Sequence, residues 1–182
     1  ATLAFSALQN NDKVGVLLFS NQVELYIPPK KGKSHILRII RELLEFNPIN
    51  KLTNINIPLE FLSGILKKKS IVFVLSDFMD DKYKKTLSIM AKKHDLTGIR
   101  VFDPKDESIP NLGVIQINDS ETGEFKWINT QSSSVRKAYS DYYYKNVSFF
   151  ESIFKKNGAG ILTCRVDESY VRKLLNFFNS RG

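Results

Sequence analysis

Apolar runs of strand length alternate with helical patterns along almost the whole chain, and this alternation limits the fold more than any other feature. Val14–Phe19 and Ile71–Ser76 are almost entirely apolar, which is typical of strands that are covered on both faces. Leu96–Phe102 and Ile161–Val166 follow as two more predicted strands. This order predicts an α/β domain in which right-handed βαβ units build a mainly parallel sheet with helices on both faces.

Two features depart from the parallel pattern. Val23–Ile27 alternates along its length, which predicts one antiparallel edge strand that ends at the Pro28-Pro29 pair, because proline cannot donate to a ladder. Val114–Ile117 and Phe125–Ile128 flank a turn-forming Asp-Ser-Glu-Thr-Gly segment, which predicts a small hairpin insertion.

The predicted helices carry start and stop signals. Ser34, Thr130 and Asp167 are expected to act as N-caps, and Gly158 and Gly160 are expected to end the longest helix. The predicted helices are Thr2–Leu8, His35–Phe46, a segment from Pro58 to near Lys69, Lys82–Lys93, a long helix from Thr130 to about Lys156, and Glu168–Asn179.

Composition is ordinary for a globular domain. The chain has 182 residues, of which 42% are hydrophobic and 25% charged, so we expect one domain over 1–182 with a loop and hairpin insertion at 105–130. The net charge of +8 favours acidic partners, but the basic residues are spread along the chain and many fall near predicted helix ends. Nucleic-acid binding is therefore a minor alternative.

Several observations predict a cytoplasmic protein. No apolar run reaches the ~20 residues that cross a bilayer, and the start has no basic signal-peptide region. The single cysteine, Cys164, excludes an intrachain disulfide and lies in an apolar stretch, where we expect a buried, inert thiol. The absence of an initial Met and the abrupt helical start indicate a piece of a longer protein.

Carboxylates follow two of the predicted parallel strands, at the sheet edge where such folds bind ligands. Asp77 follows Ile71–Ser76, and Asp103 follows Ile99–Phe102. A carboxylate there can hold a hard cation or accept loop N–H groups, and for Asp77 both interpretations stay open. For Asp103, which precedes Pro104, a turn role is favoured.

Other motifs give weaker signals. Gly32-Lys33-Ser34 lies where a phosphate loop would, but the required earlier glycine is replaced by Ile27. His35 and His94 are the only histidines and form no metal-binding or catalytic pattern. A shared helical face predicts core packing for three tyrosines, Tyr139, Tyr142 and Tyr143.

The chain resembles two nested families. Four segments in order are similar to a von Willebrand factor A-type domain: Asn11–Phe19, Pro28–His35, Leu52–Asn54 and Val72–Phe78. Four further segments resemble the MoxR-associated domain-of-unknown-function family numbered fifty-eight: His94-Asp95, Arg100–Pro104, Ile109–Gly113 and Asp119–Glu124. Each motif is short, but their order and spacing extend over almost the whole chain.

The resemblance implies a Rossmann-like sheet of the von Willebrand A type and a metal-ion-dependent adhesion site. In such a site Thr53 matches the threonine of the second loop and Asp77 the aspartate of the third, with Ser76 beside them. The first loop, an Asp-x-Ser-x-Ser run, does not occur at the start of this chain. We therefore expect little or no Mg²⁺ binding by residues 1–182, and we expect a complete Mg²⁺ site only where a full-length protein supplies the first loop.

The resemblance also implies that the family's first strand, normally central, does not lie within this chain. Val14–Phe19 and Ile71–Ser76 are then expected either to pair directly or to recruit a strand from another copy, which would make a homodimer. The implied function is a non-catalytic protein–protein interaction module of bacterial origin. It would work with a MoxR-type AAA+ ATPase or with a client protein, and without a cofactor of its own.

Two other functions stay open. The first is a metal-dependent hydrolase that uses Asp77 and Asp103 as a carboxylate pair. The second is a basic nucleic-acid-binding domain, which the net charge of +8 suggests.

Overall fold

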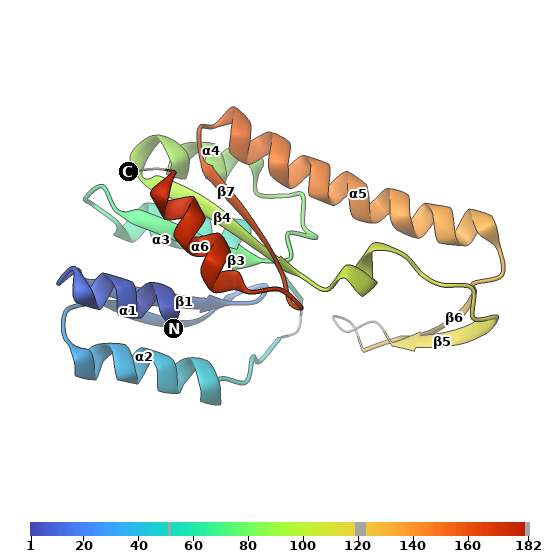
Figure 1. Ribbon diagram of the computed structural model, residues 1–182, viewed down its shortest axis with the longest axis horizontal. Helices are drawn as coiled ribbons and strands as arrows, with labels where there is room; N and C mark the ends of the chain where they lie inside the picture. The colour runs from blue at the N-terminus through green and yellow to red at the C-terminus, as the bar shows by residue number, and fades with distance from the viewer. Residues whose placement is uncertain (51, 119–122, 181–182) are drawn as a thin grey trace.

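The computed structural model describes residues 1–182 except 51, 119–122 and 181–182 (Figure 1). Its elements run in the alternating order that the sequence predicts. In chain order they are α1 (Thr2–Gln9), β1 (Val14–Phe19), β2 (Val23–Lys30), α2 (Lys33–Glu45), α3 (Asn56–Ile65), β3 (Ile71–Ser76), α4 (Lys84–Lys93), β4 (Asp95–Phe102), the short 3₁₀ helix η1 (Pro104–Glu107), β5 (Val114–Asn118), β6 (Phe125–Asn129), α5 (Ser133–Lys156), β7 (Gly160–Arg165) and α6 (Tyr170–Asn179).

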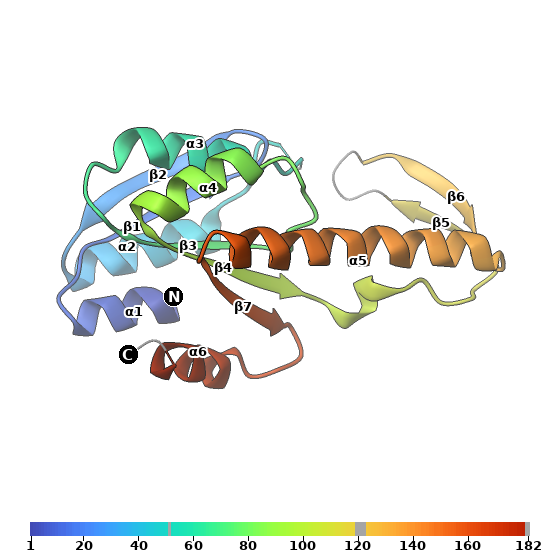
Figure 2. The ribbon, with the colours of Figure 1, turned by 90° about the horizontal axis from the view of Figure 1, so that it is seen from above.

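A parallel sheet of three strands, in the order β3-β4-β7, forms the centre of the molecule. Helices α3, α4 and α5 cover one face, and α1 and α6 lie on the other (Figure 2). The larger core lies on the first face, where Val72 and Val74 of β3 pack with Phe150 and Phe154 of α5. The predicted α/β architecture, a parallel sheet with helices on both faces, is confirmed.

Two strands form a separate antiparallel pair. β1 pairs with β2 in the predicted antiparallel sense, but within the described residues β1 makes no ladder with β3. The expectation that Val14–Phe19 and Ile71–Ser76 pair directly is therefore wrong. The physical reason lies in helix α3, which contacts β1 and β2 while its Leu59 packs in one core with Val72 and Val74 of β3, so that the helix holds the two strand pairs together without a ladder between them.

The edge strand also continues further than predicted. β2 extends to Lys30 and so includes Pro28 and Pro29, which were expected to end it. The ladder with β1 is irregular between Val14 and Val16, and Lys30 pairs with Val14 beyond that shift. The prolines fall at this irregularity, where no regular ladder donor is required.

The predicted hairpin is confirmed. β5 and β6 pair in a regular antiparallel register from Val114 with Asn129 to Asn118 with Phe125. Most of the turn predicted between them, at 119–122, lies outside the described residues.

The three predicted N-caps are wrong, because each side chain has another role. Ser34 lies inside α2, whose N-cap is Gly32 in the left-handed region at φ 105°. Thr130 is buried, and its hydroxyl donates to the Gly113 carbonyl at 2.7 Å. Asp167 pairs with Arg165 at 2.8 Å, and α6 begins only at Tyr170.

Two helix boundaries also differ from the predicted ones, since α3 ends at Ile65 and α4 begins at Lys84.

An aromatic cluster fixes the loop after β3 against α5. The rings of Phe78 and Phe150 stack with centroids 4.1 Å apart, and Phe154 meets Phe78 edge-on. Gly98 of β4 lies directly beneath, where an added Cβ would come within 2.6 Å of ring atoms of both Phe150 and Phe154. Only glycine lets the α5 rings approach β4 this closely.

Candidate functional site

Thr53 and Asp77, which the sequence singled out, line the same hollow at the carboxyl end of β3. The hollow has a volume of about 260 Å³. Thr53 comes from the loop before α3 and Asp77 from the loop after β3, and both side chains are exposed. Asp80 and Asp81 also line it, so three carboxylates gather here beside the Thr53 hydroxyl.

The loop after β3 is a tight turn in which Asp77 and Ser76 hold the backbone. The Asp77 Oδ1 oxygen accepts hydrogen bonds from the Ser76 hydroxyl at 3.2 Å and from the Met79 N–H at 3.3 Å. The Ser76 Oγ in turn accepts from the Phe78 N–H at 3.1 Å. Phe78 has a left-handed φ of 59°, which its buried, stacked ring stabilises. Ser76 therefore acts here as a turn-forming hydroxyl.

Asp80 joins the two loops that carry Thr53 and Asp77. Its Oδ2 oxygen accepts from the Ile55 N–H at 2.8 Å, and its Oδ1 oxygen accepts from the Lys82 N–H at 2.9 Å. The Asn54 N–H donates to the Ser20 carbonyl at 3.2 Å, which connects the same loop to the end of β1. Thr53 is thus positioned by the two residues that follow it, Asn54 and Ile55. Sequence reasoning missed Asp80, although its position three residues after Asp77 was a signal.

The buried side chain of Arg100 contacts the backbone of the site. This β4 side chain is 3% exposed, and its Nε donates to the Asp77 carbonyl at 3.2 Å. Its Nη2 donates to the Tyr143 hydroxyl, and the guanidinium lies over the Phe102 ring at 4.1 Å. Among the described residues it forms no salt bridge. The sequence signal that could have identified Arg100 was its position as an arginine inside a predicted strand.

Helix α5 supplies the far wall of the hollow with Tyr142, Lys145 and Asn146. The predicted core packing is correct for Tyr143, which is buried and whose pKa is raised by that burial. It is wrong for Tyr142, which is 59% exposed. Consecutive helical positions point about 100° apart, so the two tyrosines cannot both face the core.

Asp103 takes the turn role. Its Oδ1 accepts from the Lys105 N–H at 2.9 Å and so caps η1. It does not line the hollow that contains Asp77. The structure therefore does not assemble these two carboxylates as a pair.

The donor set does not fit a Mg²⁺ ion on its own. Within the part of the chain that the structure describes, no group of three or more His, Cys, Asp or Glu side chains is arranged to hold a metal. Both Asp80 oxygens already accept backbone N–H groups and Asp77 Oδ1 accepts two hydrogen bonds, which leaves Thr53, Asp81 and the second Asp77 oxygen as the principal candidates. Mg²⁺ requires near-octahedral oxygen coordination, which these three residues cannot provide alone.

Comparison with known proteins identifies the family. A family model described as "Protein of unknown function DUF58" matches residues 1–147, so the chain belongs to that family. An uncharacterized protein of Mycobacterium avium, MAV169, is 25% identical over 63% of this chain and 68% of its own length. The uncharacterized protein Rv1480 of Mycobacterium tuberculosis is 20% identical over the whole chain, which spans 58% of that relative.

A solved structure shares the fold. It is described as an aerotolerance-related membrane protein from Bacteroides fragilis with multiple mutations to serines, and it matches 98% of this chain and 86% of its own with a TM-score of 0.54. At 16% identity this likeness concerns the fold alone. In the chain studied, no helix among the described residues has the length and apolar character to span a membrane.

Proposed function

We propose that this domain is a non-catalytic protein–protein interaction module that binds its partner at the hollow formed by Thr53, Asp77 and their neighbours. The observation that carries the proposal is the set of hydrogen bonds that joins two loops and strand β4 beside that hollow. Asp80 joins the Thr53 loop to the Asp77 loop, and Arg100 holds the Asp77 backbone from below. The result is a rigid polar surface, which lowers the ordering cost of binding.

The charges of the hollow support a protein partner. Asp77 and Asp81 are exposed on one side, and Lys82 and Lys145 line the same hollow. Charges of both signs at short range favour one orientation of a partner that presents the complementary pattern. We take the partner to be a MoxR-type AAA+ ATPase or one of its client proteins, as the resemblance to the MoxR-associated domain-of-unknown-function family implies. The hollow would then be an incomplete or vestigial metal-ion-dependent adhesion site.

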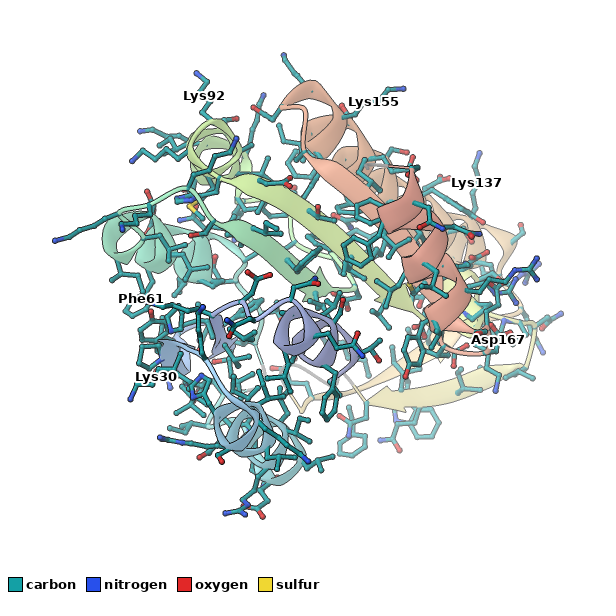
Figure 3. All side chains as sticks on the ribbon, turned by 60° about the vertical axis from the view of Figure 1, so that its left-hand side comes forward. Lys30, Phe61, Lys92, Lys137, Lys155 and Asp167 are labelled. Atoms are coloured by element: carbon teal, nitrogen blue, oxygen red, sulfur yellow. The ribbon has the colours of Figure 1, made fainter. Side chains whose placement is uncertain are left out.

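The observed geometry supports the two other functions less well. A hydrolase that uses Asp77 and Asp103 would need both carboxylates at one site, yet Asp103 caps η1 elsewhere. A nucleic-acid-binding domain would need a basic patch. Figure 3 instead shows labelled lysines spread over three elements, with Lys30 on β2, Lys92 on α4, and Lys137 and Lys155 near opposite ends of α5. Retention on DNA or RNA at low salt would favour that function over the one proposed.

The proposal is tested by calorimetric titration of the domain with a MoxR-type ATPase from the same organism. Asp77→Asn keeps the Oδ1 acceptor for Met79 and removes the charge, and Lys145→Ala removes a lysine from the opposite wall. We expect each to weaken binding about tenfold, which corresponds to ~1.4 kcal/mol. The control Asp103→Asn lies outside the hollow and should bind as the parent does. Equal affinity for all four proteins would contradict the proposal.

A further inference from the structure

A second hollow lies at the amino edge of the parallel sheet, where β3 and β4 begin. Its volume is about 570 Å³, within the range of roughly 300–1,000 Å³ that is typical of small-molecule sites. Ile71 of β3 pairs with Asp95 of the parallel strand β4, and both residues line the hollow. Asp77 follows the opposite end of β3, so this amino-edge hollow is separate from the site described above.

Backbone hydrogen bonds hold the amino-edge hollow in place. The Ser70 hydroxyl donates to the Lys68 carbonyl at 3.0 Å, and the Asp95 N–H donates to the Ser70 carbonyl at 2.9 Å. The His94 N–H donates to the Met90 carbonyl at 2.9 Å, which ends α4. The hollow is therefore formed before a ligand binds, which lowers the ordering cost of binding.

Two exposed lysines line the hollow from different elements. Lys69 comes from the loop after α3, and Lys92 comes from the end of α4, where Figure 3 shows it on the surface. Neither lysine forms a salt bridge with a residue that the structure describes. A lysine in the last turn of a helix also offsets the helix dipole, but this role does not apply to Lys69, which lies four residues beyond the end of α3. Two ammonium groups from separate elements favour a phosphate group, which accepts charge-assisted hydrogen bonds from both.

The buried imidazole of His94 lies beside these lysines. His94 lines the hollow and is 5% exposed, and neither of its ring nitrogens has a hydrogen-bond partner among the described residues. A buried polar group without a partner is destabilising. Burial, and secondarily the charge of Lys93, lowers the pKa of His94. An anion in the hollow would add the negative charge that favours the protonated ring, so the His94 ring should respond to occupancy of the hollow.

The remaining walls favour a phosphate that is part of a larger, hydroxylated molecule. Asp95 lines the hollow, and an ionised carboxylate only accepts hydrogen bonds. It would repel a bare phosphate, but it can accept a hydrogen bond from a hydroxyl group. Ile71 is 65% exposed and adds an apolar wall. A sugar phosphate combines an anionic group, hydroxyl groups and apolar C–H groups in one small molecule.

We propose that the amino-edge hollow binds a small sugar phosphate, with the phosphate between Lys69 and Lys92 and the sugar hydroxyl groups toward Asp95. The ligand is bound without a covalent step. This inference goes beyond the proposed interaction function, because it concerns the opposite edge of the sheet. Neither proposal requires the other.

The test is proton NMR of the two histidine rings of residues 1–182, titrated separately with ribose 5-phosphate, ribose and inorganic phosphate. His35, whose ring bonds the Val14 carbonyl at 2.8 Å, is an internal control far along the chain. We expect ribose 5-phosphate to shift the His94 signal saturably and to bind about tenfold more tightly than inorganic phosphate, with no shift from ribose. The titration midpoint of His94 should rise when ribose 5-phosphate is bound. Equal affinities for the two phosphates, or no saturable shift of His94, would overturn the proposal.

Lysine variants separate a site from general attraction to the positive chain. Lys69→Gln and Lys92→Gln each remove one ammonium group from the hollow, and each should weaken ribose 5-phosphate binding about tenfold. The control Lys30→Gln on β2 should bind as the parent does. Equal losses in all three variants would contradict the site and assign the binding to the net charge of +8.

Competition separates a sugar phosphate from a polyanion. A single-stranded oligonucleotide is added to the complex with ribose 5-phosphate, and the His94 signal is followed. We expect no displacement at equal phosphate concentration. Displacement at a much lower concentration would overturn the proposal in favour of nucleic acid.

Discussion

β3 and β4 are neighbours in one parallel sheet, yet their side chains have different environments. From Leu96 to Arg100 every residue of β4 is buried, between α5 on one face and α6 on the other. β3 buries Val72 and Val74 on one face and exposes Ile71 and Leu75 on the other. Among the described strands, β4 has a neighbour on each side, whereas β3 has one.

The difference shows that burial follows the number of neighbours more than the apolar character of the strand. β3 has the sequence IVFVLS, while the more polar β4 has DLTGIRVF, which includes the buried Arg100. β4 lies between α5 and α6, and even the Arg100 guanidinium is buried there. It donates hydrogen bonds to the Tyr143 hydroxyl and the Asp77 carbonyl. The open edge of β3 and the hollow at its carboxyl end thus lie on the less enclosed side of the sheet.

The largest expected effect concerns the tight packing over β4. Gly98→Ala would place a Cβ within 2.6 Å of Phe150 and Phe154, which must move or lose their stacking. We expect a loss of about 3 kcal/mol in the free energy of unfolding, measured by urea denaturation. The control Gly64→Ala in α3 has nothing within 4 Å and should gain about 0.5–1 kcal/mol. Similar stabilities for the two variants would refute the packing argument.

A matched pair of substitutions in β3 tests its two faces directly. Val74→Thr introduces a hydroxyl into the apolar core at a site that is 6% exposed, and we expect a cost of about 2 kcal/mol. Leu75→Thr changes a side chain that is 53% exposed, and its effect should stay within about 0.5 kcal/mol. Thermal unfolding of both variants checks the comparison, which fails if Leu75→Thr costs as much as Val74→Thr.

Arg100 links β4 to the site at the end of β3. Arg100→Met keeps the apolar stem but leaves the Tyr143 hydroxyl and the Asp77 carbonyl without their donor. We expect a loss of about 1.5 kcal/mol in stability and faster exchange of the Phe78 and Met79 amides. Arg172→Met, on the exposed surface of α6, is the control and should change neither quantity. Unchanged loop exchange in Arg100→Met would show that Arg100 does not position Asp77.

The smallest effect concerns the amino end of β4, where His94 is 5% exposed. Burial, and secondarily the charge of Lys93, lowers the pKa of His94 below its ordinary value of 6.5. The unfolded chain therefore binds this proton more readily than the folded one, so stability is fully present above pH 6.5 and decreases as the pH falls below it. His94→Leu should flatten the profile between pH 5 and 7, and Lys93→Gln should flatten it partly. An unchanged profile in His94→Leu would contradict this cause.

The fold was predictable to the extent that one local pattern determined each element. The apolar runs at Ile71–Ser76 and Val14–Phe19 indicated strands correctly, because both are short continuous apolar segments of strand length. The cap at Thr130 failed because its hydroxyl bonds Gly113, 17 residues away, and the cap at Asp167 failed because this side chain pairs with Arg165 while α6 begins only at Tyr170. No local sequence pattern indicated whether β1 and β3 pair, because the pairing of strands depends on the rest of the fold.

The site was predictable only in part, for the same reason. Family resemblance pointed to Thr53 and Asp77, and the structure brings both to one hollow. The family resemblance gave no indication of Asp80 or Arg100. Their hydrogen bonds to the Ile55 N–H and the Asp77 carbonyl join residues that are 25 and 23 positions apart in the sequence. Such long-range contacts have no periodic signal, so only the folded chain reveals them.

The central claim is that residues 1–182 contain an incomplete site, in which Thr53 and Asp77 lack the further ligands that a metal would need. Calorimetric titration of Mg²⁺ into residues 1–182 tests it most directly. The account predicts no saturable binding heat, and no difference between the parent chain and Asp77→Asn. A tight, saturable Mg²⁺ site that Asp77→Asn abolishes would contradict it.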